Sequence, residues 1–161
     1  MEKELSTTLA LNGWNSHVKR VDILLGKLSD EQLGNEVSPG RNRGIYLLGH
    51  LAAVHDMMLP LLGLGDALNT GYHTPFVSKA DKEVSGLPSV TELRAYWQKV
   101  NAELATRFAA LKADDWYARH TAVSEEDFKK EPHRNRLSVL LSRTTHMAYH
   151  LGQMALLAPK A

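Results

Sequence analysis

Two histidines stand four residues apart near the end of the chain, within the segment THMAYHLGQM (residues 145–154). Residues with this spacing on a helix lie about 40° apart around the axis and roughly 6 Å apart along it. The imidazoles of His146 and His150 can therefore reach one point in space. The pair alone leaves two interpretations open: the rings bind a metal ion together, or each is a polar core residue with its own hydrogen-bond partner.

A third histidine supports the metal interpretation. His50 lies within LLGHLAA, in the most apolar stretch of the chain, where an unpaired imidazole is costly to bury. Tyr46, His50 and Val54 follow one another at helical spacing, which predicts that His50 faces the core. Three neutral imidazoles suit zinc, nickel, copper or iron and leave a coordination position open, as in catalytic metal sites.

The other histidines show no comparable pairing. His55 is five residues from His50, about 140° around a helix, and we expect it to face elsewhere. We expect the remaining four at the surface: His17, His73, His120 and His133. The sequence contains no Glu-x-x-His, His-Glu-x-x-His, Gly-x-Ser-x-Gly or P-loop pattern. This argues against a di-iron carboxylate bundle, the common zinc proteases, a serine hydrolase and a P-loop nucleotide site.

Four neighbours of the histidines are candidates for orienting them or for contacting a substrate: Gln153, Tyr149, Tyr46 and Arg143. Gln153 lies three residues beyond His150 and can orient its ring or a bound water; otherwise it is a packing residue. Tyr149 follows His146 at i+3, and Tyr46 lies one turn before His50. Each tyrosine can supply a hydrogen bond or be a residue at the edge of the core.

Two further positions on the last segment have alternative interpretations. Arg143, three residues before His146, can bind an anionic substrate or form a surface ion pair. Gly152 is expected to permit a close approach between helices, because glycine otherwise costs a helix about 1 kcal/mol. No residue is assigned a catalytic role.

Helical periodicity predicts the elements that position these residues, over residues 14–28, 42–60, 89–111 and 134–159. Asn42 is the expected N-cap of the second helix, and Pro60 should kink or end it. Ser89 and Glu92 match a capping box at the start of the third. No stretch alternates with period two. The sequence therefore predicts an all-α protein, one domain over residues 1–161, with the architecture of a four-helix bundle.

The segment of residues 63–88 is longer than a usual connection between helices. It predicts a crossover along the bundle that leaves the second and third helices parallel. Residues 113–131 form another long connection. We expect both segments to set the substrate specificity of any site.

The composition narrows the classes of function. With a formal net charge of +1 and no dense run of Lys and Arg, the chain has no electrostatic signature of a nucleic-acid partner. It has no cysteine, which excludes disulfides, thiolate metal sites and a cysteine nucleophile and fits a reducing compartment. We find no signal-peptide pattern and no apolar run of about 20 residues, so we expect a cytoplasmic protein that does not act at a membrane.

The stretch LLGHLAAVHDMM and the pattern H-x-x-x-H-x-G-Q, present as HMAYHLGQ, together resemble the DinB/YfiT-like family. The segment NGWNSHVKRVDILLGKLSDEQL is similar to the first helix of that family, so the resemblance covers the whole chain. It implies a closed, left-handed four-helix bundle with up-down-down-up order. It also implies a homodimer and a divalent metal, such as zinc, nickel or iron, bound by His50, His146 and His150.

The resemblance further implies a metal-dependent reaction on a small-molecule substrate. Relatives with known activities use low-molecular-weight thiols, for thiol transfer or isomerisation, or hydrolyse amide-type bonds. The chain would then be a transferase of the thiol-transferase type or a hydrolase, and any thiol would come from outside because the chain has none. Two alternatives remain open: a non-catalytic metal-binding stress or sensor protein, and a metal-free helical interaction domain.

Overall fold

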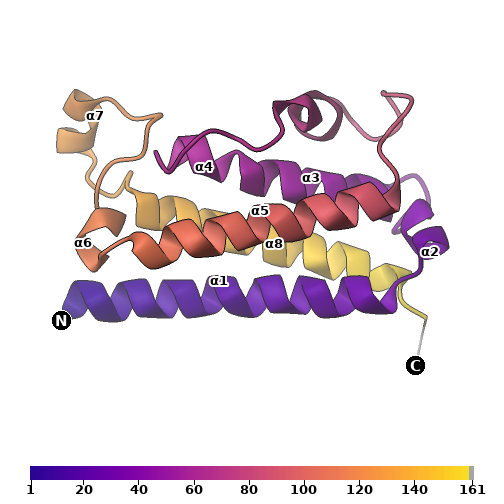
Figure 1. Ribbon diagram of the computed structural model, residues 1–161, viewed down its shortest axis with the longest axis horizontal. Helices are drawn as coiled ribbons and strands as arrows, with labels where there is room; N and C mark the ends of the chain where they lie inside the picture. Colours follow the sequence, from indigo (N-terminus) through magenta and orange to yellow (C-terminus); the bar gives the residue numbers. More distant parts are fainter. Residues whose placement is uncertain (160–161) are drawn as a thin grey trace.

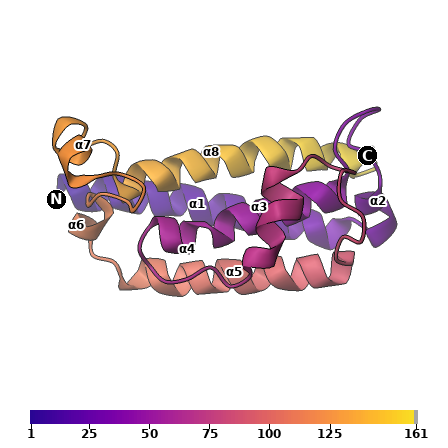
Figure 2. The same cartoon turned by 90° about the horizontal axis from the view of Figure 1, so that it is seen from above.

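The computed structural model describes residues 1–159, in which helices are the regular structure and no β-strand is present. Four long helices lie side by side (Figures 1 and 2): α1 (Glu2–Lys27), α3 (Gly44–Asp56), α5 (Val90–Ala110) and α8 (Arg136–Met154). The colours of Figure 1 show that α1 and α8 run in one direction and α3 and α5 in the other. The prediction of an all-α protein is confirmed.

Short helical elements occupy the connections. They are α2 (Asp30–Gly34), α4 (Met58–Leu61), η1 (Thr70–Tyr72), η2 (Thr74–Ser78), α6 (Ala113–Trp116), α7 (Glu125–Lys130) and η3 (Ala155–Leu157). Of these, η1 and η3 are 3₁₀ turns and η2 is a π-helical turn. The segment between α4 and α5, predicted as a crossover, runs beside α3 and contacts it through η2 (Figure 2).

The predicted start of the third helix is confirmed, whereas the expected N-cap of the second, Asn42, is wrong by one residue. The Ser89 hydroxyl accepts the Glu92 N–H, and the Glu92 carboxylate accepts the Ser89 N–H, forming the capping box. Helix α3 has Arg43 as its N-cap, and no side chain of its own caps it. The Asn42 carbonyl instead accepts the N–H of Val37, which holds Asn42 in the preceding loop.

The second helix ends four residues before Pro60, the proline that was expected to kink or end it. Helix α3 ends at Asp56, and Pro60 lies inside the short α4. A proline ring has no N–H to donate, and it clashes with the carbonyl four residues earlier. For Pro60 that carbonyl belongs to Asp56, the last residue of α3. The Asp56 side chain, 1% exposed, then accepts hydrogen bonds from the N–H groups of Leu68 (2.7 Å) and Asn69 (2.9 Å).

The core lies between the four long helices and contains the three tryptophans: Trp14, Trp97 and Trp116. His55 is fully buried, with its ring centroid 4.6 Å from that of Trp14 and 4.9 Å from that of Trp97. It faces away from His50, as expected, but it does so inside the core.

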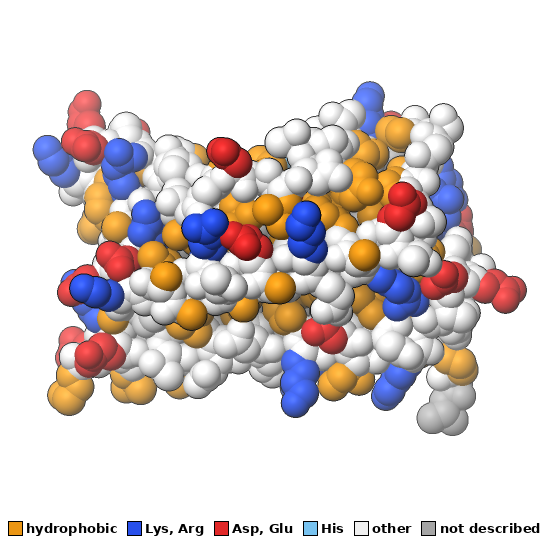
Figure 3. All heavy atoms as spheres, in the orientation of Figure 1, with side chains coloured by type: hydrophobic (Ala, Val, Ile, Leu, Met, Phe, Trp, Pro, Cys, Tyr) orange, Lys and Arg blue, Asp and Glu red, His pale blue; other side chains and the backbone are white. Residues whose placement is uncertain are grey.

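The surface differs from expectation at three histidines. Of the four histidines expected there, His133 is exposed, whereas His17, His73 and His120 are half-buried because neighbouring loops and helices cover them. Apolar side chains gather in the furrow between α5 and the segment that crosses above it, while charged side chains follow the outer side of α5 (Figure 3). Within residues 1–159 no helix is both long enough and apolar enough to cross a membrane.

Candidate metal centre

Three imidazoles converge between α3 and α8. His146 Nε2 lies 3.1 Å from His50 Nε2 and 3.0 Å from His150 Nε2. The ring nitrogens that these residues offer all lie within 4.8 Å of one another. The structure thus brings together residues 96 positions apart in the sequence, because α3 and α8 pack against each other at this level.

Hydrogen bonds at Nδ1 determine which nitrogens carry protons. His50 Nδ1 lies 2.7 Å from the carbonyl oxygen of Phe76, which can only accept, so His50 donates from Nδ1. His150 Nδ1 lies 2.7 Å from Oε1 of Gln153 and donates in the same way. Both Nε2 atoms therefore carry a lone pair, and both lone pairs are directed toward His146.

His146 cannot satisfy this arrangement alone. Its Nδ1 is buried and has no hydrogen-bond partner among residues 1–159. If Nε2 carries the proton, one N–H faces two acceptors; if Nδ1 carries it, three lone pairs face one another and a buried N–H has no acceptor. A cation at the centre of the three Nε2 atoms removes the conflict. Zinc–nitrogen bonds of about 2.0–2.1 Å place ligand nitrogens a little over 3 Å apart, so the donor set fits a metal ion.

Burial keeps the three imidazoles neutral at physiological pH. Burial and, to a lesser extent, positive charge on His150, His50 and Arg143 together lower the pKa of His146 to about 4. Burial likewise lowers the pKa of His50 and of His150, although their hydrogen bonds to Phe76 and Gln153 oppose the shift. The three rings therefore stay unprotonated at neutral pH, and an unprotonated imidazole is the form that binds a metal ion.

The position of His50 depends on a close approach between α3 and η2. Phe76, fully buried in η2, packs on α3 at Gly49, where a Cβ atom would lie 2.3–2.5 Å from three atoms of the phenyl ring. Only glycine admits the ring at this distance. The approach places the Phe76 carbonyl on His50 Nδ1.

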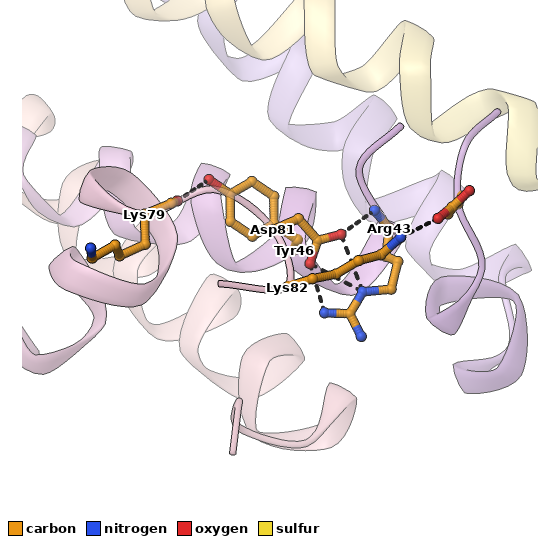
Figure 4. A network of polar contacts seen from close by, with 6 residues as sticks. Arg43, Tyr46, Lys79, Asp81 and Lys82 are labelled. Carbon is orange, nitrogen blue, oxygen red and sulfur yellow. Dashed lines mark hydrogen bonds and ion pairs between the residues drawn. The ribbon is translucent and has the colours of Figure 1, made fainter. Parts of the chain in front are cut away.

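A network at the start of α3 fixes the segment that carries Phe76 (Figure 4). The Asp81 carboxylate accepts the Arg43 N–H at 2.7 Å and the Arg43 guanidinium at 2.6 Å. The Tyr46 hydroxyl donates to the carbonyl of Lys79 at 2.8 Å, and Lys82 pairs with Glu36. Burial would raise the pKa of Asp81, but the hydrogen bonds from Arg43 outweigh it and hold this pKa below its usual value.

The candidates on α8 form a short chain that leads outward from the site. Gln153 accepts from His150 Nδ1 and donates from Nε2 to the Tyr149 hydroxyl at 3.2 Å. Tyr149 is 64% exposed, and its ring contacts that of His150, with centroids 5.1 Å apart. It reaches the site through Gln153 and His150, whereas the spacing predicted a role at His146.

Two other candidates differ from their predictions. The Tyr46 ring stacks on His50, with centroids 6.1 Å apart and planes at 15°, but its hydroxyl is bound to Lys79 and supplies nothing to the site. Arg143 forms no ion pair with any residue from 1 to 159, and its Nε is buried without a partner. The side of Gly152 where a Cβ would stand is open, so this glycine does not mediate helix packing within the chain.

Comparison with protein families matches residues 15–154 to the DinB superfamily. The chain belongs to the DinB superfamily. The match covers α1 from residue 15 onward and the whole of α3, α5 and α8, and it includes His50, His146 and His150. No curated protein gives a significant match. Membership of the DinB superfamily and the cluster of three histidines are compatible with metal binding.

Sequence reasoning missed the residues that support His50 in this member of the DinB superfamily. Phe76 contributes a backbone carbonyl, which no side-chain pattern can reveal. Gly49 did carry a signal: a glycine inside an apolar helix and next to a histidine indicates a close approach. Asp81 follows no recognisable pattern, because its partner Arg43 is 38 positions away.

Proposed function

We propose that this protein binds a divalent transition metal through His50, His146 and His150 and is a metal-dependent enzyme. The observation that carries the proposal is the convergence of three Nε2 atoms, two of which have lone pairs fixed by hydrogen bonds at Nδ1. Zinc, nickel and iron all suit this donor set. The reaction we propose is transfer of a low-molecular-weight thiol, with hydrolysis as the second candidate.

When bound, the metal would supply a Lewis acid that lowers the pKa of a thiol or a water at its open position. The chain's own residues prepare that position. The Phe76 carbonyl and Gln153 hold the protons of His50 and His150 at Nδ1, so the rings keep one orientation. The Tyr149 hydroxyl accepts from Gln153 and keeps its own O–H for solvent or a substrate at the rim.

The first test is metal content. Elemental analysis of protein purified without a polyhistidine tag should find close to one transition-metal ion per chain, and His50→Ala, His146→Ala and His150→Ala should each lose it. His133→Ala, at an exposed histidine, is the control and should keep the metal. Circular dichroism should show that all variants remain helical. A wild-type protein that stays metal-free after incubation with zinc, nickel and iron would instead favour a helical interaction domain.

A second test separates an enzyme from a non-catalytic metal-binding sensor. In cobalt-substituted protein, 2-mercaptoethanol should change the visible spectrum if a coordination position is open to a thiol. A spectrum that neither this thiol nor imidazole changes would indicate a closed site and the sensor alternative. The spectral change should persist in Tyr46→Phe, because the Tyr46 hydroxyl is directed away from the site.

We further propose that the four long helices form one domain with the closed, left-handed, up-down-down-up bundle of the family, located in the cytoplasm. The helix directions, with α1 and α8 running one way and α3 and α5 the other, and the core that the four helices share support the bundle. We also propose a homodimer, because exposed leucines lie on the adjacent helices α1 and α8: Leu5 (61%), Leu9 (62%) and Leu141 (50%). Sedimentation should show a dimer that a Leu5→Glu, Leu9→Glu double variant weakens.

A further inference from the structure

Arg143 is the positively charged group nearest the candidate metal centre for which the structure shows no counter-charge. It lies three residues before His146 on α8, and a charge on it acts on both His50 and His146. Its Nε is buried, and no residue from 1 to 159 forms an ion pair or hydrogen bond with its side chain. Burial is the one cause that acts on its pKa, and it lowers it. By contrast, the Arg43 guanidinium is bound to Asp81.

Two cavities meet at Arg143. The first, of about 190 Å³, has a mainly apolar lining: Val54, Met57, Leu61, His73, Val77 and Arg143. Val54 lies one turn beyond His50 on α3 and Arg143 lies three residues before His146 on α8, so this cavity lies about one helical turn from the candidate centre. Leu61 and Arg143 also line the second cavity, which has a volume of about 310 Å³.

The second cavity is basic. Besides Leu61, Val139 and Arg143, it is lined by His120, His133, Arg134, Ser138 and Ser142. Neither lining contains an aspartate or a glutamate among the residues that the structure describes. His120 Nδ1, like Arg143 Nε, is buried without a hydrogen-bond partner among residues 1–159. Arg134 is paired with Glu131 at 3.1 Å, which leaves Arg143 as the arginine available to an anion.

Buried polar atoms are nearly always hydrogen-bonded, and one left without a partner costs free energy. Arg143 Nε and His120 Nδ1 are two such buried atoms on residues that line one basic cavity, while the Arg143 side chain as a whole is half-buried, and together they indicate that a ligand completes the site. We propose that Arg143 binds the oxyanion of a small organic acid whose apolar part fills the cavity lined by Val54, Met57, Leu61 and Val77.

The inference that this acid is a substrate rests on the proposed function. The inference that the acid binds at Arg143 does not. Guanidinium–carboxylate pairs are the strong, charge-assisted type of hydrogen bond. The connection of residues 63–88 contributes His73 and Val77 to the smaller cavity, and the connection of residues 113–131 contributes His120 to the larger one. Both connections were predicted to set substrate specificity.

The test is isothermal titration of metal-free and zinc-loaded protein with sodium hexanoate and, separately, with 1-hexanol, which lacks the charge. Hexanoate should bind the metal-free wild type once per chain. The affinity for hexanol should be at least about tenfold lower. Arg143→Met should bind hexanoate at least about tenfold more weakly than the wild type, with its helicity unchanged. Arg20→Met, at an exposed arginine of α1, is the control and should bind hexanoate as the wild type does.

Equal binding of hexanoate by the wild type and Arg143→Met would overturn the proposal. So would the absence of hexanoate binding to the wild type, or an equal loss of it in Arg20→Met. Inorganic phosphate is titrated as a separate arm: if it binds as tightly as hexanoate with the same dependence on Arg143, the apolar cavity has no part in recognition and the organic acid is wrong. If Arg143→Met does not fold, Arg143→Lys replaces it and should lose affinity because lysine cannot bind bidentately.

Zinc stoichiometry, measured on the same samples, distinguishes this proposal from the proposed function. Arg143→Met should bind zinc as the wild type does, because Arg143 is not a ligand. Hexanoate binding that depends on Arg143 in a protein that binds no zinc would sink the proposed function and leave the anion site standing. Zinc binding without hexanoate binding would do the opposite.

Discussion

Gly49 controls how closely Phe76 approaches His50. The variant Gly49→Ala places a Cβ atom where three ring atoms of Phe76 lie at 2.3–2.5 Å, so the ring and its carbonyl must move away from α3. We expect a loss of about 1–3 kcal/mol of unfolding free energy, as for other overpacked cores. We also expect weaker zinc binding, because His50 loses its acceptor. Urea unfolding of the metal-free protein and calorimetric zinc titration measure the two effects.

Gly13→Ala is the matched control for Gly49→Ala. Gly13 also lies inside a long helix, but a Cβ there would have no neighbour within 4 Å. Helix propensity alone should then stabilise the protein, by up to about 1 kcal/mol, with no change in zinc affinity. If Gly49→Ala behaves like Gly13→Ala, Phe76 does not restrict this site.

Gln153 should affect metal affinity without contacting the metal, because it accepts the Nδ1 proton of His150 and so orients that ring. Gln153→Leu removes the acceptor of His150 Nδ1–H, and the loss of such an acceptor typically lowers metal affinity about 10–100-fold. Gln153→Glu keeps an acceptor at this position and should restore most of the affinity. Zinc titration against a competing chelator checks both variants. Equal affinities of the leucine variant and the wild type would show that His150 needs no orienting partner.

At the scale of elements, one ion pair anchors the segment that follows η2 to the start of α3. The Asp81 side chain is 3% exposed and binds both the backbone and the side chain of Arg43. We expect Asp81→Ala to leave the four long helices intact but to loosen residues 74–79, because a buried hydrogen bond to a charged group contributes about 1.5–3 kcal/mol. Hydrogen exchange of those amides should accelerate, and zinc affinity should fall.

Lys82→Ala is the control for the same segment, since Lys82 forms the neighbouring but exposed pair with Glu36. Exposed pairs contribute about 0–1 kcal/mol, so exchange and zinc affinity should stay close to those of the wild type. Faster exchange in both variants alike would mean that Asp81 has no special role in holding η2.

Elements with local signals were the predictable part of this structure. The Ser89 capping box, the apolar stripes and the break near Pro60 follow from neighbouring residues, and the spacing of His146 and His150 follows from the helical repeat. The N-cap of α3 was mispredicted because the Gly44 N–H, which an Asn42 cap would have bound, donates to the carbonyl of Asn35, and Asp81, 38 residues away, binds the Arg43 N–H. Likewise, no local pattern could show that the carbonyl of Phe76 supports His50.

At the scale of the whole molecule, the packing of helices decides which histidines share a site. The angle between His50 and His55 correctly indicated that they face different sides of α3. It could not indicate what His55 would meet. The packing of α3 against α1 and α5 places its ring between Trp14 and Trp97, with Nδ1 bound to Asn101 Oδ1 at 3.0 Å. Its Nε2 is buried without a partner among residues 1–159.

This burial should make the whole fold sensitive to acid. Burial lowers the pKa of His55 from 6.5 to about 3, so between these values the unfolded chain binds a proton that the folded chain does not. Stability is therefore fully present above pH 6.5 and is lost as the pH falls toward 3. The slope approaches about 1.4 kcal/mol per pH unit for this one group, which amounts to roughly 2–3 kcal/mol by pH 4.5.

The variant His55→Asn isolates this contribution. Its side-chain amide can still donate toward Asn101, but it does not titrate. At pH 7 the variant should be less stable than the wild type, because the smaller side chain leaves a cavity between two tryptophans. Between pH 6.5 and 4.5, however, its unfolding free energy in urea should fall less steeply than that of the metal-free wild type. The difference in slope should approach about 1.4 kcal/mol per pH unit, which corresponds to one proton. Parallel curves would show that His55 becomes protonated inside the folded protein, and that water or a rearranged core reaches its Nε2.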